Sequence, residues 1–251
     1  MSLFTIAHLS DLHLGGPPDA RARTERAVTY LLLLDPRPDV LLVTGDIADH
    51  GLAEEYDAAR AALDAWPGPV LVGTGNHDVR DAFADGLLLG ARAERLDRVL
   101  ETDRARFLML DSLVSAPPGE RIDHGELTEP SLAWLDEQLS ADPRPAFVGL
   151  HHPPVEIGVS LMDPIMLRSP ERLAEVLERH PHVVATLVGH AHTQATSTFA
   201  GRPLLIGGGV ASTVPLDAEP LPVVWEAGPP TIAFHHLHGD GRLTTHWRAL
   251  V

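Results

Sequence analysis

The chain has 251 residues, of which 44% are hydrophobic and 22% charged, a composition typical of a globular protein with one large α/β domain or two small ones. It lacks cysteine and lysine, which excludes disulfides, thiolate metal ligands, a cysteine nucleophile and a lysine Schiff base. Its net charge of −16 opposes sequence-independent binding to nucleic acid, because that binding depends on basic side chains that neutralise phosphates.

No apolar run approaches the roughly 18 residues of a membrane span, and the N-terminus reads directly into a strand where an export signal would have a basic segment. We therefore expect a cytoplasmic protein without a membrane partner. A small anionic substrate is compatible with the negative charge if bound metal supplies local positive charge.

The first third of the chain alternates strand-like and helix-like segments. The pattern predicts strands at 3–9, 40–43 and 70–72, and helices at about 19–34 and at 53–66. Asp35-Pro36 and Pro67-Gly68 end the two helices. This β-α-β-α-β order indicates a sheet with a parallel portion and helices packed on it.

The remainder is less regular. It predicts strands at 96–101, 106–111, 146–150 and 183–188, helices at 128–139 and 170–179, and a hairpin at 231–238 and 242–248. Residues 215–230 contain five prolines and are expected to form an irregular surface loop. Since no repeat or linker is found, we expect a single α/β domain over residues 1–251.

Five predicted strands run into clusters of polar residues. These clusters are Ser10-Asp11-Leu12-His13, Gly45-Asp46, Gly75-Asn76-His77-Asp78, His151-His152-Pro153-Pro154 and Gly189-His190-Ala191-His192. In open α/β sheets, ligands collect beyond the carboxyl ends of the strands, so distant clusters can meet there. Asn76 is the only asparagine of the chain, which suggests that an amide is needed at this position.

Taken singly, each cluster also has a structural interpretation. Gly45-Asp46 is a common turn, Asn76 could satisfy a loop, and His151 could pack beside a rigid proline turn. Asp11 and His13 would project to one face and could share a metal if the segment is extended, but the pair could also be a solvated acid at a strand end beside a chance histidine. The interpretation as a metal site therefore rests on the presence of all five clusters in one chain.

Together they provide a set of nitrogen and oxygen donors suited to Zn, Fe or Mn. The donors are Asp11, His13, Asp46, Asn76, His151, His190 and His192. If Asp46 bridges two metals, each metal receives four protein contacts, and a shared hydroxide leaves one position for a substrate oxygen. Two divalent metals ~3.5–4 Å apart can stabilise both the attacking and the leaving oxygen of a displacement at phosphorus.

The ordered motifs D-x-H, G-D, G-N-H-D, H-x-P and G-H-x-H resemble those of the calcineurin-like metallophosphoesterase superfamily, over residues 4 to about 207. The HHPP motif, the later Met162-Asp163-Pro164-Ile165 and the compact size are most similar to class III cyclic nucleotide phosphodiesterases and the related glycerophosphodiesterases. The resemblance implies a four-layer αββα sandwich with two mixed sheets and a metal site at the strand carboxyl ends.

Carried over by position, the resemblance implies that Asp11, His13, Asp46 and His192 hold the first metal, and that Asp46, Asn76, His151 and His190 hold the second. It implies two catalytic residues: His77 would contact the phosphate and protonate the leaving oxygen, and Asp78 would orient its ring. The substrate is expected to contact His13, Asp46, Asn76, His77 and His192. Val79 stands where relatives often have an acid.

The implied activity is hydrolysis of small phosphodiesters, first of all cyclic nucleotides, by attack of a metal-bridging hydroxide at phosphorus. A glycerophosphodiesterase or a broad phosphoesterase is the alternative, with specificity expected in the rims at 154–168 and 210–230. A metal-free scaffold of the same fold is a more distant alternative, because no ligand position is missing. The native metals, self-association and the role of Arg80, which could bind phosphate or pair with an acid, stay open.

Overall fold

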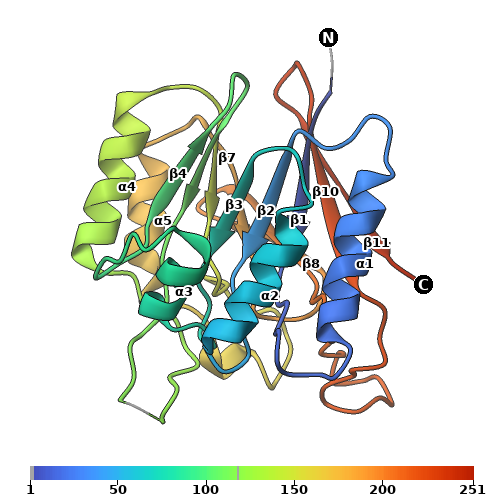
Figure 1. Cartoon of the computed structure of the whole chain (residues 1–251). Coiled ribbons are helices and arrows are strands. Elements are labelled where there is room, and N and C mark those ends of the chain that lie inside the picture. The colour runs from blue at the N-terminus through green and yellow to red at the C-terminus, as the bar shows by residue number, and fades with distance from the viewer. Residues whose placement is uncertain (1–2, 118) are drawn as a thin grey trace.

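The computed structural model describes residues 3–117 and 119–251, and two β-sheets that face each other form its centre (Figure 1). The first sheet has the order β11-β10-β1-β2-β3, with β1 Phe4–Leu9, β2 Val40–Thr44, β3 Val70–Gly73, β10 Thr231–Leu237 and β11 Leu243–Ala249. Strands β1, β2 and β3 are parallel, whereas β10 and β11 form an antiparallel hairpin that pairs with β1. The predicted parallel portion and the predicted hairpin are confirmed.

The second sheet has the order β4-β5-β6-β7-β9-β8. Its strands are β4 Arg98–Glu101, β5 Arg106–Met109, β6 Ala146–Gly149, β7 Val183–Val188, β8 Ala195–Phe199 and β9 Arg202–Ile206. The four central strands are parallel, and β4 and β8 are antiparallel edge strands. Both sheets are therefore mixed, as expected.

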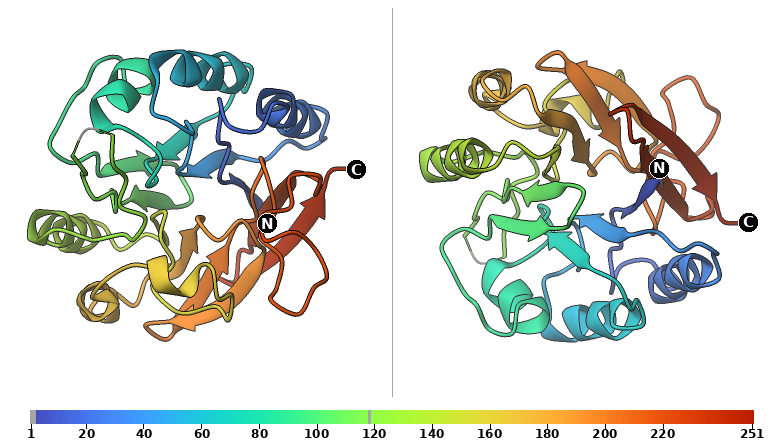
Figure 2. Two further views of the ribbon diagram at one scale, coloured as in Figure 1. Left: turned by 90° about the horizontal axis from the view of Figure 1, so that it is seen from below. Right: turned by 90° about the horizontal axis from the view of Figure 1, so that it is seen from above.

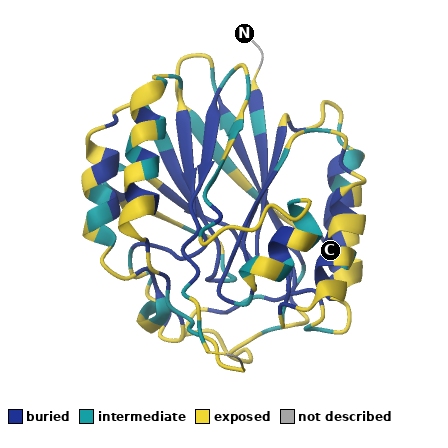
Figure 3. Ribbon diagram, turned by 60° about the vertical axis from the view of Figure 1, so that its left-hand side comes forward, coloured by how far each residue is buried: buried dark blue, intermediate teal, exposed yellow. Residues whose placement is uncertain are grey.

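Helices cover the outer face of each sheet, so the molecule has four layers (Figure 2). The helices are α1 Ala20–Leu32, α2 Ala53–Leu63, α3 Arg80–Leu87, α4 Glu129–Ala141 and α5 Pro170–Glu178. The first three pack on the first sheet and the last two on the second. Buried strands between half-exposed helices are visible in Figure 3. The αββα sandwich is confirmed.

Three apolar layers hold this arrangement together. Phe4, Leu42, Phe107 and Phe147 belong to the cluster between the sheets, where the rings of Phe107 and Phe147 stack with centroids 5.3 Å apart. Two further clusters lie under the two sets of helices. The sheets are thus fixed relative to each other, and so are the loops at their ends.

Helix α3 and strands β8 and β9 were not predicted from the sequence. Helix α3 has only eight residues and buries just Phe83 and Ala84, so it is too short for a helical period to stand out in the sequence. Strand β8 is polar and mostly exposed, and it turns into β9 at Ala200-Gly201, where both φ angles are positive. The proline-rich stretch 215–230 is irregular and largely exposed, as expected. No helix in the described ranges is both long and apolar enough for a bilayer span.

The loops after β1, β2, β3, β6 and β7 meet at one end of the sandwich. The backbone N–H of Asp11 donates to the carbonyl of Gly45 at 3.1 Å, and that of His13 donates to the carbonyl of Asp46 at 2.9 Å. Similarly, the N–H of Gly189 donates to the carbonyl of His151 at 3.0 Å. The parallel strands therefore bring the polar clusters side by side.

Candidate metal centre

Five of the seven predicted ligands have a left-handed backbone conformation, which is uncommon for residues other than glycine. Their φ values are 56° for Asp11, 41° for His13, 50° for Asp46, 67° for His190 and 51° for His192. The segment at 11–13 is therefore not extended, and tight turns rather than strand alternation direct Asp11 and His13 to the same place. Such conformations each cost on the order of 1–3 kcal/mol and gather at functional sites.

The first group of donors consists of Asp11, His13, Asp46 and His192, and one ligand atom of each lies within 4.8 Å of the others. Nε2 of His13 lies 3.0 Å from Nε2 of His192 and 3.5 Å from Oδ2 of Asp46. Nε2 of His192 lies 3.5 Å from Oδ1 of Asp11. This is the set that the resemblance to the calcineurin-like superfamily implied for the first metal.

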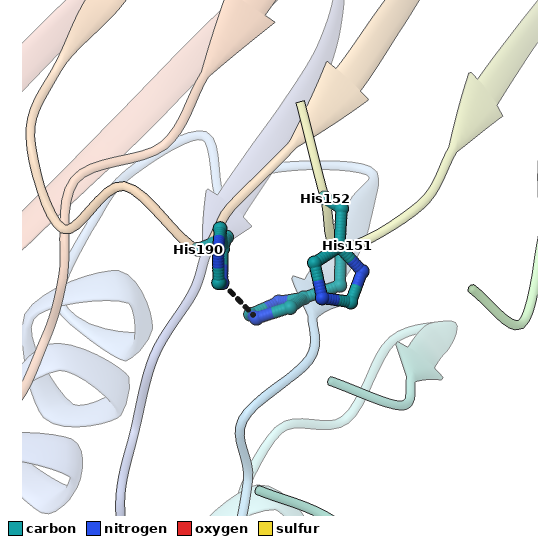
Figure 4. Close-up of side chains that lie close together, drawn as sticks. All are labelled: His151, His152 and His190. Carbon is teal, nitrogen blue, oxygen red and sulfur yellow. Dashed lines mark hydrogen bonds between the residues drawn. The ribbon is translucent and has the colours of Figure 1, made fainter. Parts of the chain in front are cut away.

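The second group converges on Nε2 of His151. This atom lies 3.2 Å from Oδ2 of Asp46, 3.1 Å from Oδ1 of Asn76 and 3.2 Å from Nδ1 of His190. Figure 4 shows the rings of His151 and His190 turned toward each other. The same oxygen of Asp46 therefore faces both groups.

The donor sets fit two metal ions. With metal–ligand bonds of ~2.1 Å, neighbouring donors of a tetrahedral or octahedral ion lie roughly 3.0–3.4 Å apart, close to the spacing of these atoms. Oδ2 of Asp11 is buried and has no hydrogen-bond partner within the described chain. A bound cation would satisfy this carboxylate oxygen, since a buried charge without a partner is costly.

Each of the four histidines uses its other ring nitrogen to bind the protein. Nδ1 of His13 lies 2.8 Å from Oδ1 of Asp49, Nδ1 of His151 2.6 Å from the Thr44 carbonyl, Nε2 of His190 3.1 Å from the Ile165 carbonyl, and Nδ1 of His192 2.8 Å from Oγ of Ser212. A proton on the outer nitrogen leaves the inner nitrogen free, and this hydrogen bond fixes the ring orientation. These four partners were not predictable from the sequence, because no motif distinguishes them.

The electrostatics of the metal-free site show a deficit of positive charge. Burial alone would lower the pKa of His151, but the charges of Asp46 and Asp11 outweigh it and raise that pKa to about 9. Burial pushes the pKa of Asp46 upward, yet His151 and His13 hold it well below its usual range. A proton on His151 therefore compensates the carboxylates in the position where a cation would do so.

His77 lies beside the two groups and contacts Asp46, Asp49 and Arg121. Its backbone N–H donates to Oδ1 of Asp46 at 2.9 Å, while its Nδ1 lies 2.9 Å from the carbonyl oxygen of Asp49 and 2.9 Å from Nη1 of Arg121. Nδ1 cannot donate to the carbonyl and accept from the guanidinium at once, so the position of Arg121 determines which nitrogen of the ring carries the proton.

The role predicted for Asp78 is wrong. Its carboxylate accepts hydrogen bonds from the backbone N–H groups of Ile47 (3.2 Å), Ala48 (3.1 Å) and Gly75 (2.8 Å), and not from the ring of His77. Burial and the charge of Asp46 raise the pKa of Asp78 to about 7. Asp78 thus ties the loop that follows Asp46 to the loop that carries Asn76, whereas Asp49 contacts the His77 ring through its carbonyl oxygen.

His152 is close to His151 and His190, as Figure 4 shows, but both of its ring nitrogens have other partners. Nδ1 lies 2.8 Å from Oγ of Ser112 and Nε2 lies 3.2 Å from the carbonyl oxygen of Asp123. These contacts give His152 a supporting role outside the donor set. Among the described residues, His235, His236 and His238 do not form a metal-binding group.

A cavity of about 890 Å³ opens next to His77. It is lined by residues 49–50, 76–81, 93–94, 113–117 and 119–122, and by none of the residues 154–168 or 210–230 that were expected to form the substrate rim. Of the five predicted substrate contacts, Asn76 and His77 line it. Arg80 also lines it, but Nε of Arg80 donates to the buried Asp111 at 2.6 Å, which makes the acid its partner.

The sequence profile of the calcineurin-like phosphoesterase family matches residues 4–194. The chain belongs to this family. It is 32% identical to the glycerophosphodiester phosphodiesterase GpdQ of Enterobacter lignolyticus, over 94% of this chain and 87% of the relative. It is 35% identical to a probable cyclic nucleotide phosphodiesterase of Rhodococcus erythropolis, over 85% and 73% of the two chains.

Among solved structures, a dimetal phosphatase from Danio rerio superposes with a TM-score of 0.74 and 19% identity, over 98% of this chain and 96% of that chain. At this identity the likeness shows the fold alone. Together, the family match and the relatives confirm the predicted family and the predicted class of phosphodiester hydrolase.

Proposed function

We propose that this chain is a two-metal phosphodiesterase that hydrolyses small phosphodiesters, with cyclic nucleotides as the first candidate substrates. One observation carries the proposal: Oδ2 of Asp46 lies 3.5 Å from Nε2 of His13 and 3.2 Å from Nε2 of His151. A single carboxylate oxygen that faces two complete donor sets has the position of a bridging ligand. A scaffold without metals would not need it.

In this proposal the first ion is held by Asp11, His13, Asp46 and His192, and the second by Asp46, Asn76, His151 and His190. Two divalent ions supply Lewis-acid polarisation of phosphate oxygens and lower the pKa of a bound water. The donors are nitrogen and oxygen atoms, which suits Fe, Mn or Zn equally. The neutral amide of Asn76 adds a ligand without adding negative charge to the site.

His77 is the proposed general acid. When Nδ1 donates to the Asp49 carbonyl at 2.9 Å, Nε2 is left to hold a proton for the leaving oxygen. Burial lowers the pKa of His77, which makes the imidazole a better proton donor once it is charged. The contact of Arg121 with the same Nδ1 would have to open for this arrangement.

The organic part of the substrate is proposed to occupy the cavity beside His77. Its volume of about 890 Å³ lies within the range of small-molecule sites and is sufficient for a nucleoside. The relative GpdQ supports glycerophosphodiesters as the second candidate, since it matches 94% of this chain. We keep a cytoplasmic location, a single domain and the absence of nucleic acid binding as parts of the same proposal.

A substrate panel tests the proposal. Metal-free protein is reconstituted with Mn, Fe or Zn, and hydrolysis of 2′,3′- and 3′,5′-cyclic nucleotides, glycerophosphodiesters and an aryl diester is compared. We expect metal-dependent hydrolysis of the diesters, with the highest kcat/KM for a cyclic nucleotide. Preference for glycerophosphodiesters would select the second candidate, and no hydrolysis by the metal-loaded protein would refute both.

A further inference from the structure

Five side chains form a continuous hydrogen-bonded chain below the metal site, which we call the buried histidine chain. It runs from Oγ1 of Thr245 to Nδ1 of His235 (2.9 Å), from Nε2 of His235 to Nδ1 of His8 (3.2 Å), from Nε2 of His8 to Oγ1 of Thr44 (2.8 Å), and from there to Oγ of Ser10 (2.9 Å). His8, Ser10, Thr44 and His235 are at most 1% exposed.

The buried histidine chain lies between the two sheets. A Cβ atom at Gly207, which follows β9, would lie 3.1 Å from the His8 ring, and one at Gly189, which follows β7, would lie 1.8 Å from Oγ of Ser10. Polar groups thus end the apolar layer between the sheets just below the ligand loops. Burial of these polar groups costs free energy unless all of them are hydrogen-bonded, so an apolar core at this position would be the simpler solution if stability alone mattered.

The hydrogen bonds of this chain can point in only one direction. Oγ of Ser10 donates to the carbonyl oxygen of Thr44 at 3.4 Å, because a carbonyl can only accept. Ser10 therefore accepts from the Thr44 hydroxyl, which in turn accepts from Nε2–H of His8. His8 Nδ1 then accepts from Nε2–H of His235, whose Nδ1 accepts from Thr245. Burial lowers the pKa of both histidines, so each ring has one donor and one acceptor.

Each donor therefore points to the next member of the chain, and the last one, the Ser10 hydroxyl, points to the carbonyl oxygen of Thr44. This oxygen also accepts from Nδ1–H of His151 at 2.6 Å. We propose that the buried histidine chain positions His151: it restrains the Thr44 carbonyl, and through it the Nε2 atom that faces Asp46 and Asn76. Hydrogen bonds in such a chain polarise one another, so each contributes to the last one. The inference rests on the ligand role proposed for His151.

The substitution Thr44→Val tests the inference, with Thr44→Ser as the matched control. Valine keeps the branched shape and the backbone carbonyl but breaks the chain between His8 and Ser10, whereas serine keeps the hydroxyl. Loss of a hydrogen-bond partner of a metal-bound histidine typically costs 10–100-fold in metal affinity, and for this more distant group we expect about 3–10-fold. His8→Leu, with His8→Gln as its control, is a second independent pair.

Chelator competition with Mn²⁺ gives the affinities of the two ions separately, and NMR follows the imidazole Nδ1–H resonance of His151. In Thr44→Val we expect only the ion at His151 to bind more weakly, and the Nδ1–H resonance of His151 to shift. In Thr44→Ser we expect the affinity for that ion and the resonance to remain as in the wild type. Equal weakening of both ions, together with a lower free energy of unfolding, would mean general loosening and would overturn the inference. So would an unchanged affinity. Failure of the wild-type protein to bind two ions would instead refute the proposed function.

Discussion

Oδ1 of Asp49 lies 2.8 Å from Nδ1 of His13, and the backbone carbonyl of the same aspartate lies 2.9 Å from Nδ1 of His77. The hydrogen bond of Asp49 to His13, together with the charges of Asp46 and Asp11, outweighs burial and raises the pKa of His13. Asp49 thus orients one predicted metal ligand and the predicted general acid at once.

Asp49→Asn should weaken binding of the first metal ion. The amide keeps the shape of the side chain but removes the charge that holds the imidazole in its metal-binding orientation, so affinity should fall about 10–100-fold. Chelator competition measures the effect. Asp57→Asn, at an exposed position on α2 where the carboxylate pairs with Arg60, is the control. Unchanged affinity in Asp49→Asn would show that the hydrogen bond to His13 is dispensable.

His77→Ala should reduce turnover and leave the metals in place. A general acid contributes roughly 10²–10⁴-fold to the rate, so kcat should fall in that range for a diester with a poor leaving group. Metal analysis of the same preparation separates catalysis from binding, and His246→Ala on the edge strand β11 is the control. Loss of metal from His77→Ala would make His77 a ligand.

Much of the fold was predictable from the sequence because its strands are buried, short and separated by clear helix and turn signals. Val40–Thr44 is fully buried, and the Asp35-Pro36 and Pro67-Gly68 breaks mark the helix ends. The polar edge strand Ala195–Phe199 gave no such signal, because only Phe199 is buried.

The meeting of the candidate donors at one place was predictable for a different reason: polar clusters that follow parallel strands lie together beyond the carboxyl ends of those strands. The partners behind the ligands were not, since Asp49, Ser212 and the Thr44 carbonyl are brought to the rings by tertiary structure. The left-handed turns at Asp11 and His13 also escaped prediction, because neither position holds the glycine or asparagine that usually signals such a backbone.

Metal binding should weaken as the pH falls. The histidine ligands must be neutral to bind, so protons compete with metal ions. Because the pKa of His151 in the metal-free site is raised to about 9, affinity should already rise with pH between 6 and 9. Below about pH 6 we expect the ions to dissociate, because His13, whose pKa is also raised by Asp49 and the neighbouring carboxylates, then carries a proton as well. A metal-to-protein ratio that stays constant down to pH 5 would contradict this competition.

The stability of the metal-free protein should depend on the protonation of His8. Burial lowers its pKa from 6.5 to about 3 in the folded state, so the unfolded state binds the proton first. The contribution of neutral His8 to the free energy of unfolding is complete above pH 6.5. As the pH falls below this value, the contribution is lost at about 1.4 kcal/mol per pH unit. Relative to His8→Gln, which does not titrate, the wild type should therefore lose stability between pH 6.5 and 4.5 in urea unfolding. Parallel pH profiles would contradict a neutral buried His8.

The most direct test of the proposed function is a titration of metal-free protein with Mn²⁺, in which bound metal and hydrolysis of an aryl phosphodiester are followed in the same samples. We predict saturation at two ions per chain, with hydrolysis that appears as the second ion binds. A chain that takes up two ions and hydrolyses no diester, or that saturates below two ions at neutral pH, would contradict it.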